Sequence, residues 1–241
     1  MCGIVGYAGK TNVIKNIMTG LKSLEYRGYD SSGIAYLDKN NNIKIYKKVG
    51  QIKNLDQILN YEDEASLGIS HTRWATHGGV TDTNAHTHNQ GKITLVHNGI
   101  IENYEELKRQ LEKEGYNFKS STDSEVAAAL IDKLYKENKD MLKTLVILKD
   151  KLKGSYAFNI INDDYRIDYL RAHIKACQDA ITDGVKLLAY CTWSYTDLFS
   201  WLNGYQKRYG FVYVNVDEDS DKDLARYKKK SFYWYKKVIE S

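Results

Sequence analysis

Met1-Cys2-Gly3-Ile4-Val5-Gly6 places a thiol one cleavage away from a free chain terminus. If Met1 is removed, Cys2 carries both a nucleophile and an α-amino group. Because a free α-amino group titrates near ~7.7–8.0, part of it is unprotonated at neutral pH and can accept the thiol proton, directly or through one water. The same hexapeptide also fits an ordinary buried first strand. Only the rest of the first half of the chain separates these two interpretations.

The composition excludes several classes of protein. The 241 residues carry 35 basic and 31 acidic side chains without a continuous basic stripe, so a nucleic-acid partner is not indicated. The three cysteines, Cys2, Cys177 and Cys191, are too few and too scattered for a disulfide framework, and no zinc-site spacing occurs. No apolar run reaches the ~18 residues of a membrane helix. We therefore expect a cytoplasmic protein without a membrane partner.

Hydrophobic periodicity predicts an α+β first half. Strands are predicted at residues 2–8, 33–37, 43–49, 67–71, 93–97 and 155–161. Helices are predicted from residue 13 to 24 and at 55–59, 103–114, 124–136 and 141–151. The polar, glycine-rich stretch 71–79 is predicted to be a loop, and the strand at 93–97 is predicted to stop at Asn98-Gly99.

The character of the sequence changes at residues 162–164. A helix is predicted at 165–181, and the apolar run at 185–192 lacks alternation, which is typical of a strand buried on both faces in a parallel sheet. Aromatic residues are frequent after it. We therefore expect a domain boundary between residues 161 and 162.

Five sequence blocks occur in order in the first half: Cys2-Gly3-Ile4-Val5-Gly6, Tyr26-Arg27-Gly28-Tyr29-Asp30-Ser31, the stretch 71–78, Val96-His97-Asn98-Gly99-Ile100-Ile101-Glu102-Asn103, and Ser121-Thr122-Asp123-Ser124-Glu125. Through them, residues 1–161 resemble the glutaminase domain of class II (N-terminal-nucleophile) glutamine amidotransferases, specifically the glutamine–fructose-6-phosphate aminotransferase family, which makes glucosamine 6-phosphate. The resemblance implies an αββα sandwich, incomplete here because the resemblance stops near residue 160. It also implies L-glutamine as substrate, no cofactor, an oligomeric family, and a sugar phosphate acceptor only in the complete enzyme.

The resemblance assigns the parts of a thiol-dependent amide hydrolysis. Cys2 would attack the side-chain amide of glutamine, forming a γ-glutamyl thioester and releasing ammonia. The Asn98 side chain and the Gly99 backbone N–H would stabilise the oxyanion. Arg73 would bind the α-carboxylate of glutamine with bidentate geometry, and Asp123 would bind its α-amine. The alternatives from the residues alone are an Asn-Gly turn after a strand and, for Asp123, a helix N-cap.

The resemblance also implies a group of pocket residues. Trp74, Thr76 and His77 would shape the glutamine pocket and its lid, and His86 would line it. Without the resemblance, Trp74 would be interpreted as a core aromatic residue. His86 and His88 have the spacing of a metal-binding pair, but no carboxylate or cysteine lies near them in the sequence, so we expect no metal.

Residues 162–241 resemble the C-terminal end of a family 1 glycoside hydrolase, a helix–strand–helix fragment of a (β/α)8 barrel. The resemblance rests on Asp164–Leu170, Asp183-Gly184-Val185, Trp193–Asp197, Ser200–Phe211 and Ser231–Tyr235. Ser200, Lys207 and Tyr209 match the positions that hold the sugar phosphate in 6-phospho-β-glycosidases, and Trp193 would be the stacking platform. On the residues alone, Lys207 would be a solvated basic residue and Trp193 a core residue.

Retaining glycosidases need two catalytic carboxylates, and neither family signature for them occurs in this chain, so we expect no glycosidase activity. The leading interpretation is a chimeric or misassembled chain whose identifiable enzyme is the glutaminase. The alternatives are a catalytically silent fusion and a 6-phospho-β-glucosidase fragment that retains only phosphoglycoside binding.

Overall fold

The structure, a computed structural model, describes residues 2–9, 12–38, 42–75, 78–162, 165–192, 194–198, 210–216 and 223–240. The chain divides into two compact units, Met1–Asp163 and Asp164–Ser241. Each unit is described by itself below.

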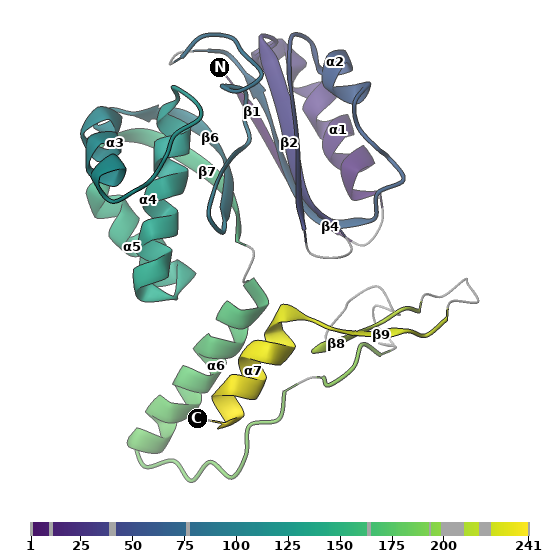
Figure 1. The fold of residues 1–241 in the computed structure, drawn as a ribbon, viewed down its shortest axis with the longest axis vertical. Helices are drawn as coiled ribbons and strands as arrows, with labels where there is room; N and C mark the ends of the chain where they lie inside the picture. Colours follow the sequence, from purple (N-terminus) through teal and green to yellow (C-terminus); the bar gives the residue numbers. More distant parts are fainter. Residues whose placement is uncertain are drawn as a thin grey trace. The chain divides into compact units, whose positions relative to one another are not determined.

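The first unit begins with a four-stranded antiparallel sheet in the order β1-β4-β2-β3. Its strands are β1 (Gly3–Ala8), β2 (Ser31–Asp38), β3 (Ile43–Val49) and β4 (Ala65–Arg73). Two α-helices, α1 (Val13–Ser23) and α2 (Ile52–Asp56), cover one face of the sheet, and a short 3-10 helix, η1 (Glu25–Arg27), follows α1. Figure 1 shows α1 lying along this outer face.

A second, three-stranded antiparallel sheet has the order β5-β6-β7. Its strands are β5 (His88–Gln90), β6 (Ile93–Ile101) and β7 (Gly154–Asn162). Three helices, α3 (Tyr104–Lys113), α4 (Asp123–Asn138) and α5 (Met141–Lys151), pack on its outer side. Helix α4 is the most buried of the three because it carries an apolar run, Val126-Ala127-Ala128-Ala129-Leu130-Ile131, whose residues are all buried.

Strand alternation explains how two sheets and two helical layers can stack on one another. In β2, Ile34 and Tyr36 face the helices of the first layer, whereas Ala35 and Leu37 face the second sheet. Val96 of β6 belongs to the same inter-sheet cluster. Since neighbouring side chains of a strand point to opposite faces, each sheet is apolar on both sides. The result is a helix–sheet–sheet–helix sandwich, which confirms the predicted α+β class.

Two strands are longer than the sequence predicted. Strand β4 continues through His71 and Thr72 to Arg73, where a loop was predicted, because β1 and β2 pair with it on either side. Strand β6 continues past Asn98-Gly99 to Ile101, because it pairs with β7 along its whole length. The predictions that these strands end at residues 71 and 97 were therefore wrong.

The second unit begins with α6 (Tyr165–Thr182) and ends with α7 (Lys230–Glu240). Between the helices, β8 (Val212–Val214) pairs with β9 (Arg226–Lys228) as a two-stranded antiparallel sheet. The predicted buried strand at 185–192 is wrong, because this segment forms no strand and Leu188 is 98% exposed. The expected helix–strand–helix order of a barrel fragment is therefore not present in the described residues of this unit.

Candidate active site

Cys2 owes its position to the register between the first and fourth strands. Gly3 of β1 pairs with Thr72 of β4, so the preceding residue comes beside the end of β4. There the backbone N–H of Trp74 donates to Cys2 Sγ at 3.2 Å, and the thiol lies 3.5 Å from the Trp74 carbonyl oxygen. Cys2 is partly buried and forms no disulfide. These contacts hold the thiol beside the end of β4.

The Tyr26–Ser31 block braces the end of β4. At Gly28, a Cβ atom would lie 2.7 Å from the carbonyl of Arg73, so only glycine allows this close backbone approach. Thr72 Oγ1 donates to the Gly28 carbonyl, and the Asp30 carboxylate accepts from the backbone N–H of Ala75. The Asp30 N–H donates to the Arg73 carbonyl at 3.2 Å. This block therefore fixes the backbone that carries the arginine.

Asn98 reaches Cys2 from the opposite sheet. Its Nδ2 donates to the Cys2 carbonyl oxygen at 3.2 Å. The neighbouring Gly99 has a φ of +138°, and a Cβ atom there would lie 2.0 Å from the Ser155 carbonyl oxygen. Glycine is therefore required by both the backbone conformation and the lack of space. The two predicted oxyanion donors come from one stretch of β6, and Asn98 contacts Cys2, the predicted nucleophile.

Arg73 is the last residue of β4 and is 3% exposed. Its Nη1 and Nη2 donate to the carbonyl oxygens of Gly79 and Gly78, each at 3.2 Å. These contacts hold the guanidinium in one orientation. Trp74, next in sequence, is 49% exposed and makes an edge contact with Tyr29, so it is a surface aromatic residue rather than a core residue.

Asp123 is the first residue of α4, and the N-cap is Thr122, whose hydroxyl accepts from the Glu125 N–H. The alternative interpretation of Asp123 as the helix N-cap is therefore wrong, because Thr122 makes the capping hydrogen bond. Its Oδ2 accepts from the backbone N–H of Ile101 at 2.9 Å, and it is 3.8 Å from His97 Nδ1. Like the arginine, Asp123 is almost fully buried.

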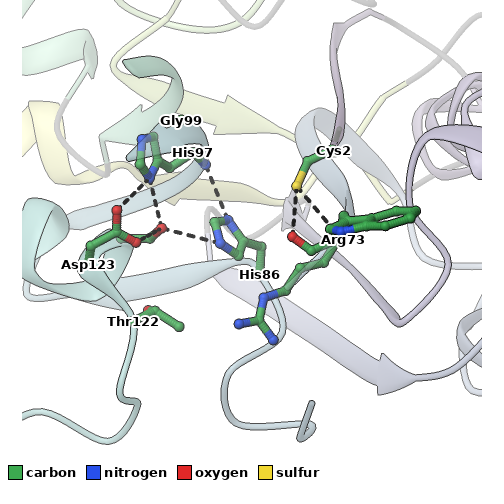
Figure 2. Close-up of a pocket in the computed structure, with 9 residues that line it drawn as sticks. Cys2, Arg73, His86, His97, Gly99, Thr122 and Asp123 are labelled. Carbon is green, nitrogen blue, oxygen red and sulfur yellow. Dashed lines mark hydrogen bonds and ion pairs between the residues drawn. The ribbon is translucent and has the colours of Figure 1, made fainter. Parts of the chain in front are cut away.

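Three buried histidines pack against one another, and one of them, His86, lies between Arg73 and Asp123 (Figure 2). The His71 and His86 rings stack with centroids 4.0 Å apart, and His88 meets His86 edge-on at 4.8 Å. Burial, with the nearby His97, lowers the pKa of His71 to about 3, and burial also holds the pKa values of His86 and His88 well below the usual value. All three rings are therefore neutral at physiological pH.

One pocket brings together six of the nine residues predicted for the glutamine site, and Asn98 is not among those that line it. It is lined by Cys2, Arg73, Trp74, His86, His97, Gly99, Thr122, Asp123 and Ser124. Figure 2 shows Cys2 and Arg73 on one side of His86, with Asp123 and His97 on the other. A cation and an anion thus lie in the same small pocket as the thiol.

The sequence prediction missed three lining residues, His97, Thr122 and Ser124. The signal for them was present, because all three residues belong to two of the quoted sequence blocks. Thr76 and His77, predicted for the lid, lie outside the described residues, as do Trp193, Ser200, Lys207 and Tyr209 of the second unit.

In the part of the chain that the structure describes, no group of three or more His, Cys, Asp or Glu side chains is arranged to hold a metal ion. Among the described helices, none is long and apolar enough to span a bilayer.

Curated relatives match most of this chain. It is 47% identical over 166 residues to the glutamine–fructose-6-phosphate aminotransferase (isomerizing) of Acinetobacter baylyi, a match that covers 68% of this chain and 27% of the relative. The enzyme of the same name from Aquifex aeolicus is 49% identical over 164 residues, covering 67% and 27%. The chain therefore spans about a quarter of the length of these relatives.

Two solved structures match about two thirds of this chain. A glutamine phosphoribosylpyrophosphate amidotransferase from B. subtilis matches with a TM-score of 0.58 and 28% identity, over 68% of this chain and 35% of that one. An allosteric regulatory enzyme of purine biosynthesis matches with a TM-score of 0.59 and 29% identity, over 68% and 36%. These similarities confirm the predicted resemblance of the sandwich to glutamine amidotransferases.

The C-terminal part is similar to a different family. The sequence model of glycosyl hydrolase family 1 matches residues 129–241. The match confirms the predicted resemblance of the C-terminal segment, and it begins inside α4 of the first unit.

Proposed function

We propose that residues 1–161 form a glutamine-hydrolysing domain of the kind found in glutamine–fructose-6-phosphate aminotransferases, followed by a glycosidase-like segment from residue 162. The observation that carries the proposal is the pocket in which the Cys2 thiol, the Arg73 guanidinium and the Asp123 carboxylate lie together. An amino acid carries one anionic and one cationic group next to its side chain. A pocket with one cation, one anion and one nucleophile matches these three parts of glutamine.

The proposed reaction is nucleophilic amide hydrolysis. The α-amino group of a processed Cys2 takes the thiol proton, and Sγ attacks the side-chain carbonyl carbon of glutamine. The carbonyl π electrons move to oxygen, and the resulting oxyanion accepts hydrogen bonds from Asn98 Nδ2 and the Gly99 N–H. When the carbon–nitrogen bond breaks, the proton held by the α-amino group passes to the leaving nitrogen, which departs as ammonia. Water then cleaves the thioester to give glutamate and restore the thiol.

Substrate orientation is the proposed role of the buried charges. Arg73 would bind the α-carboxylate through two parallel N–H donors, and Asp123 would bind the α-ammonium. Trp74 would cover the outer side of the bound amino acid, with Thr76 and His77 from the same segment, and His86 would form the floor between the two charges. This arrangement would favour an α-amino acid over a simple amide.

The relatives' name describes transfer of the released nitrogen to fructose 6-phosphate. This chain matches about a quarter of their length, so for these residues we propose hydrolysis of glutamine alone. The mechanism also requires that Cys2 carry the free amino terminus. Intact mass spectrometry of the purified chain should therefore show the loss of Met1, and retention of Met1 would remove the base that the mechanism uses.

Ammonia release from L-glutamine tests the proposal. The chain should release ammonia, and Cys2→Ala should abolish the release. The matched control is Cys177→Ala, since Cys177 lies on α6 of the second unit, and it should leave the rate unchanged. If Cys2→Ala and the unmodified chain release ammonia at the same rate, the domain is a catalytically silent relative.

A second candidate function, binding of a sugar phosphate by the C-terminal segment, is favoured by the family 1 match to residues 129–241. Ser200, Lys207 and Tyr209 would hold the phosphate, and Trp193 would stack on the sugar. Calorimetric titration with glucose 6-phosphate tests it: binding should be lost in Lys207→Gln. Equal heats from the variant and the unmodified chain would exclude this role for Lys207.

A further inference from the structure

The Ser124 hydroxyl lies at the centre of a buried polar network beside the pocket. Ser124 Oγ is 2.9 Å from His97 Nδ1, 3.2 Å from His86 Nε2 and 3.3 Å from Asp123 Oδ1. Ser124 is 1% exposed and His86 is 5% exposed. Water therefore has little access to these groups, and they must satisfy one another.

A backbone donor sets the direction of the hydrogen bonds. The N–H of His97 donates to His86 Nδ1 at 3.2 Å, so that nitrogen is an acceptor. Because burial keeps the His86 ring neutral, its single proton is on Nε2. His86 Nε2–H can then donate to Ser124 Oγ. A backbone N–H cannot reverse its role, so the tautomer of His86 follows from the fold.

The same reasoning assigns the donor that holds the Asp123 carboxylate. A serine hydroxyl has one proton to donate, and once Oγ accepts from His86 that proton can go to Asp123 Oδ1 or to His97 Nδ1. The carboxylate is the stronger acceptor because it is charged, and His97 Nδ1–H can then donate to Oγ. At the other end, Ile101 N–H donates to Asp123 Oδ2. Each carboxylate oxygen is thereby held by its own donor.

We propose that Ser124 and His86 are positioning residues that hold the Asp123 carboxylate toward the α-ammonium group of bound glutamine. The inference rests on the proposed function. With a donor on only one oxygen, the carboxylate could rotate about its Cβ–Cγ bond; with a donor on each, it presents a fixed edge to the pocket. Neither Ser124 nor His86 acts on the amide that reacts.

The test compares two ligands that differ only at the amine. L-Glutamine and glutaramate, which has hydrogen in place of the α-amino group, are titrated calorimetrically into the full chain carrying Cys2→Ala, so that nothing is turned over. Hydrogen bonds to charged groups are strong enough that Ser124→Ala should weaken glutamine binding about ten-fold. Glutaramate binding should not change. The control Ser23→Ala, at an exposed hydroxyl on α1, should alter neither affinity.

Several results would overturn the inference. Equal weakening of both ligands would show that Ser124 has only a structural role, and no weakening would show that it has no role. If the chain carrying Cys2→Ala alone binds both ligands with equal affinity, Asp123 does not bind the α-ammonium group. Nitrogen-15 spectra of the unmodified chain give a measurement that needs no variant: His86 should carry its proton on Nε2, and a proton on Nδ1 would contradict the network. Ammonia release by the unmodified chain tests the proposed function separately.

Discussion

Arg73 and Asp123 are charged residues that the fold keeps almost fully buried. Unpaired buried charges are costly, and here each is held by backbone groups: Gly78 and Gly79 carbonyls for Arg73, and the Ile101 N–H for Asp123. Groups held in this way do not need to reorganise when a substrate arrives. The binding of glutamine should therefore be sensitive to small changes at either residue.

Replacing Arg73 should affect binding more than chemistry. Arg73→Ala removes the proposed partner of the α-carboxylate. Loss of hydrogen bonds to a charged group should raise KM about 10- to 100-fold. The KM of Arg73→Lys should lie between those of Arg73→Ala and the unmodified chain, because lysine keeps the charge but not the paired donors. Steady-state ammonia release measures both, with exposed Arg109→Ala on α3 as control. A fall in kcat at unchanged KM would place Arg73 in the chemical step instead.

The neutral histidines should make the first unit sensitive to acid. The pKa of His71 is about 3 in the folded chain, against about 6.5 in the unfolded chain. Between these values the unfolded chain binds the extra proton, so stability is lost as pH falls below 6.5, by up to about 1.4 kcal/mol per pH unit for one such histidine. The destabilisation caused by His71 stops increasing once the pH falls below the pKa of His71 in the folded chain.

Urea unfolding at pH values from 7 to 4 measures this loss. His71→Met should unfold with a shallower pH dependence than the unmodified chain, whatever its stability at pH 7. The control Gln178→Ala, which removes no titratable group from α6, should leave the slope as it is. Identical slopes in His71→Met and the unmodified chain would mean that His71 is not kept neutral by the fold.

At the scale of elements, the beginning of α4 links stability to the site. The Thr122 hydroxyl caps the helix, and Asp123 follows it directly. Thr122→Ala should cost about 1 kcal/mol of stability and should also weaken glutamine binding, because the helix N-terminus carries the carboxylate.

Asp140→Ala is the matched control for that prediction. Asp140 caps α5 through the Lys143 N–H at 3.0 Å, and it does not line the pocket. Its loss should cost a similar amount of stability without changing glutamine affinity, while Thr122→Ser should preserve both. Thermal unfolding and calorimetric titration measure the two effects. Equal glutamine affinities in Thr122→Ala and Asp140→Ala would show that the cap does not position Asp123.

The sequence predicted most elements correctly because their hydrophobic periodicity is strong. The prediction failed where polar residues of the candidate site lie buried in a strand. His71, Thr72 and Arg73 look like a loop, yet they lie in a strand flanked on both sides, and only the fold supplies those partners. The failure at 185–192 has the opposite cause: an apolar run was interpreted as buried, although nothing in its sequence specifies what would cover it.

The proposed nucleophile and the two proposed charge-binding residues come from the five ordered blocks, and the structure places all three in one pocket. The positioning network was not predictable from the sequence. Whether Ser124 meets His86 depends on contacts between segments 38 residues apart in sequence, and no local pattern specifies such a contact.

Among the residues that the structure describes, the two units differ in how much apolar core they bury. The first has three apolar clusters in successive layers. The second has a pair of three-residue strands, and it leaves Val185, Leu187 and Leu188 exposed. Isolated two-stranded sheets are marginally stable. We therefore expect the second unit to open more readily than the first.

Hydrogen exchange followed by mass spectrometry measures that difference. Peptides from β4 and β6 should be protected far longer than peptides from α6, β8 and β9, because opening of the sandwich requires breaking all of its layers. Equal protection of the two units would show that they unfold together, and would count against a chain assembled from two independent parts.

Covalent labelling tests whether Cys2 is a nucleophile in a glutamine-specific pocket. A glutamine-like electrophile, which keeps the α-carboxylate and α-amine but carries a reactive carbon in place of the side-chain amide, is incubated with the full chain. Peptide mapping then locates the added mass. We predict a single adduct on Cys2, with none on Cys177 or Cys191, and protection by L-glutamine but not by D-glutamine. Labelling of all three cysteines at similar rates, or labelling of Cys2 that L-glutamine does not slow, would show that Cys2 is not a nucleophile in a glutamine-binding pocket.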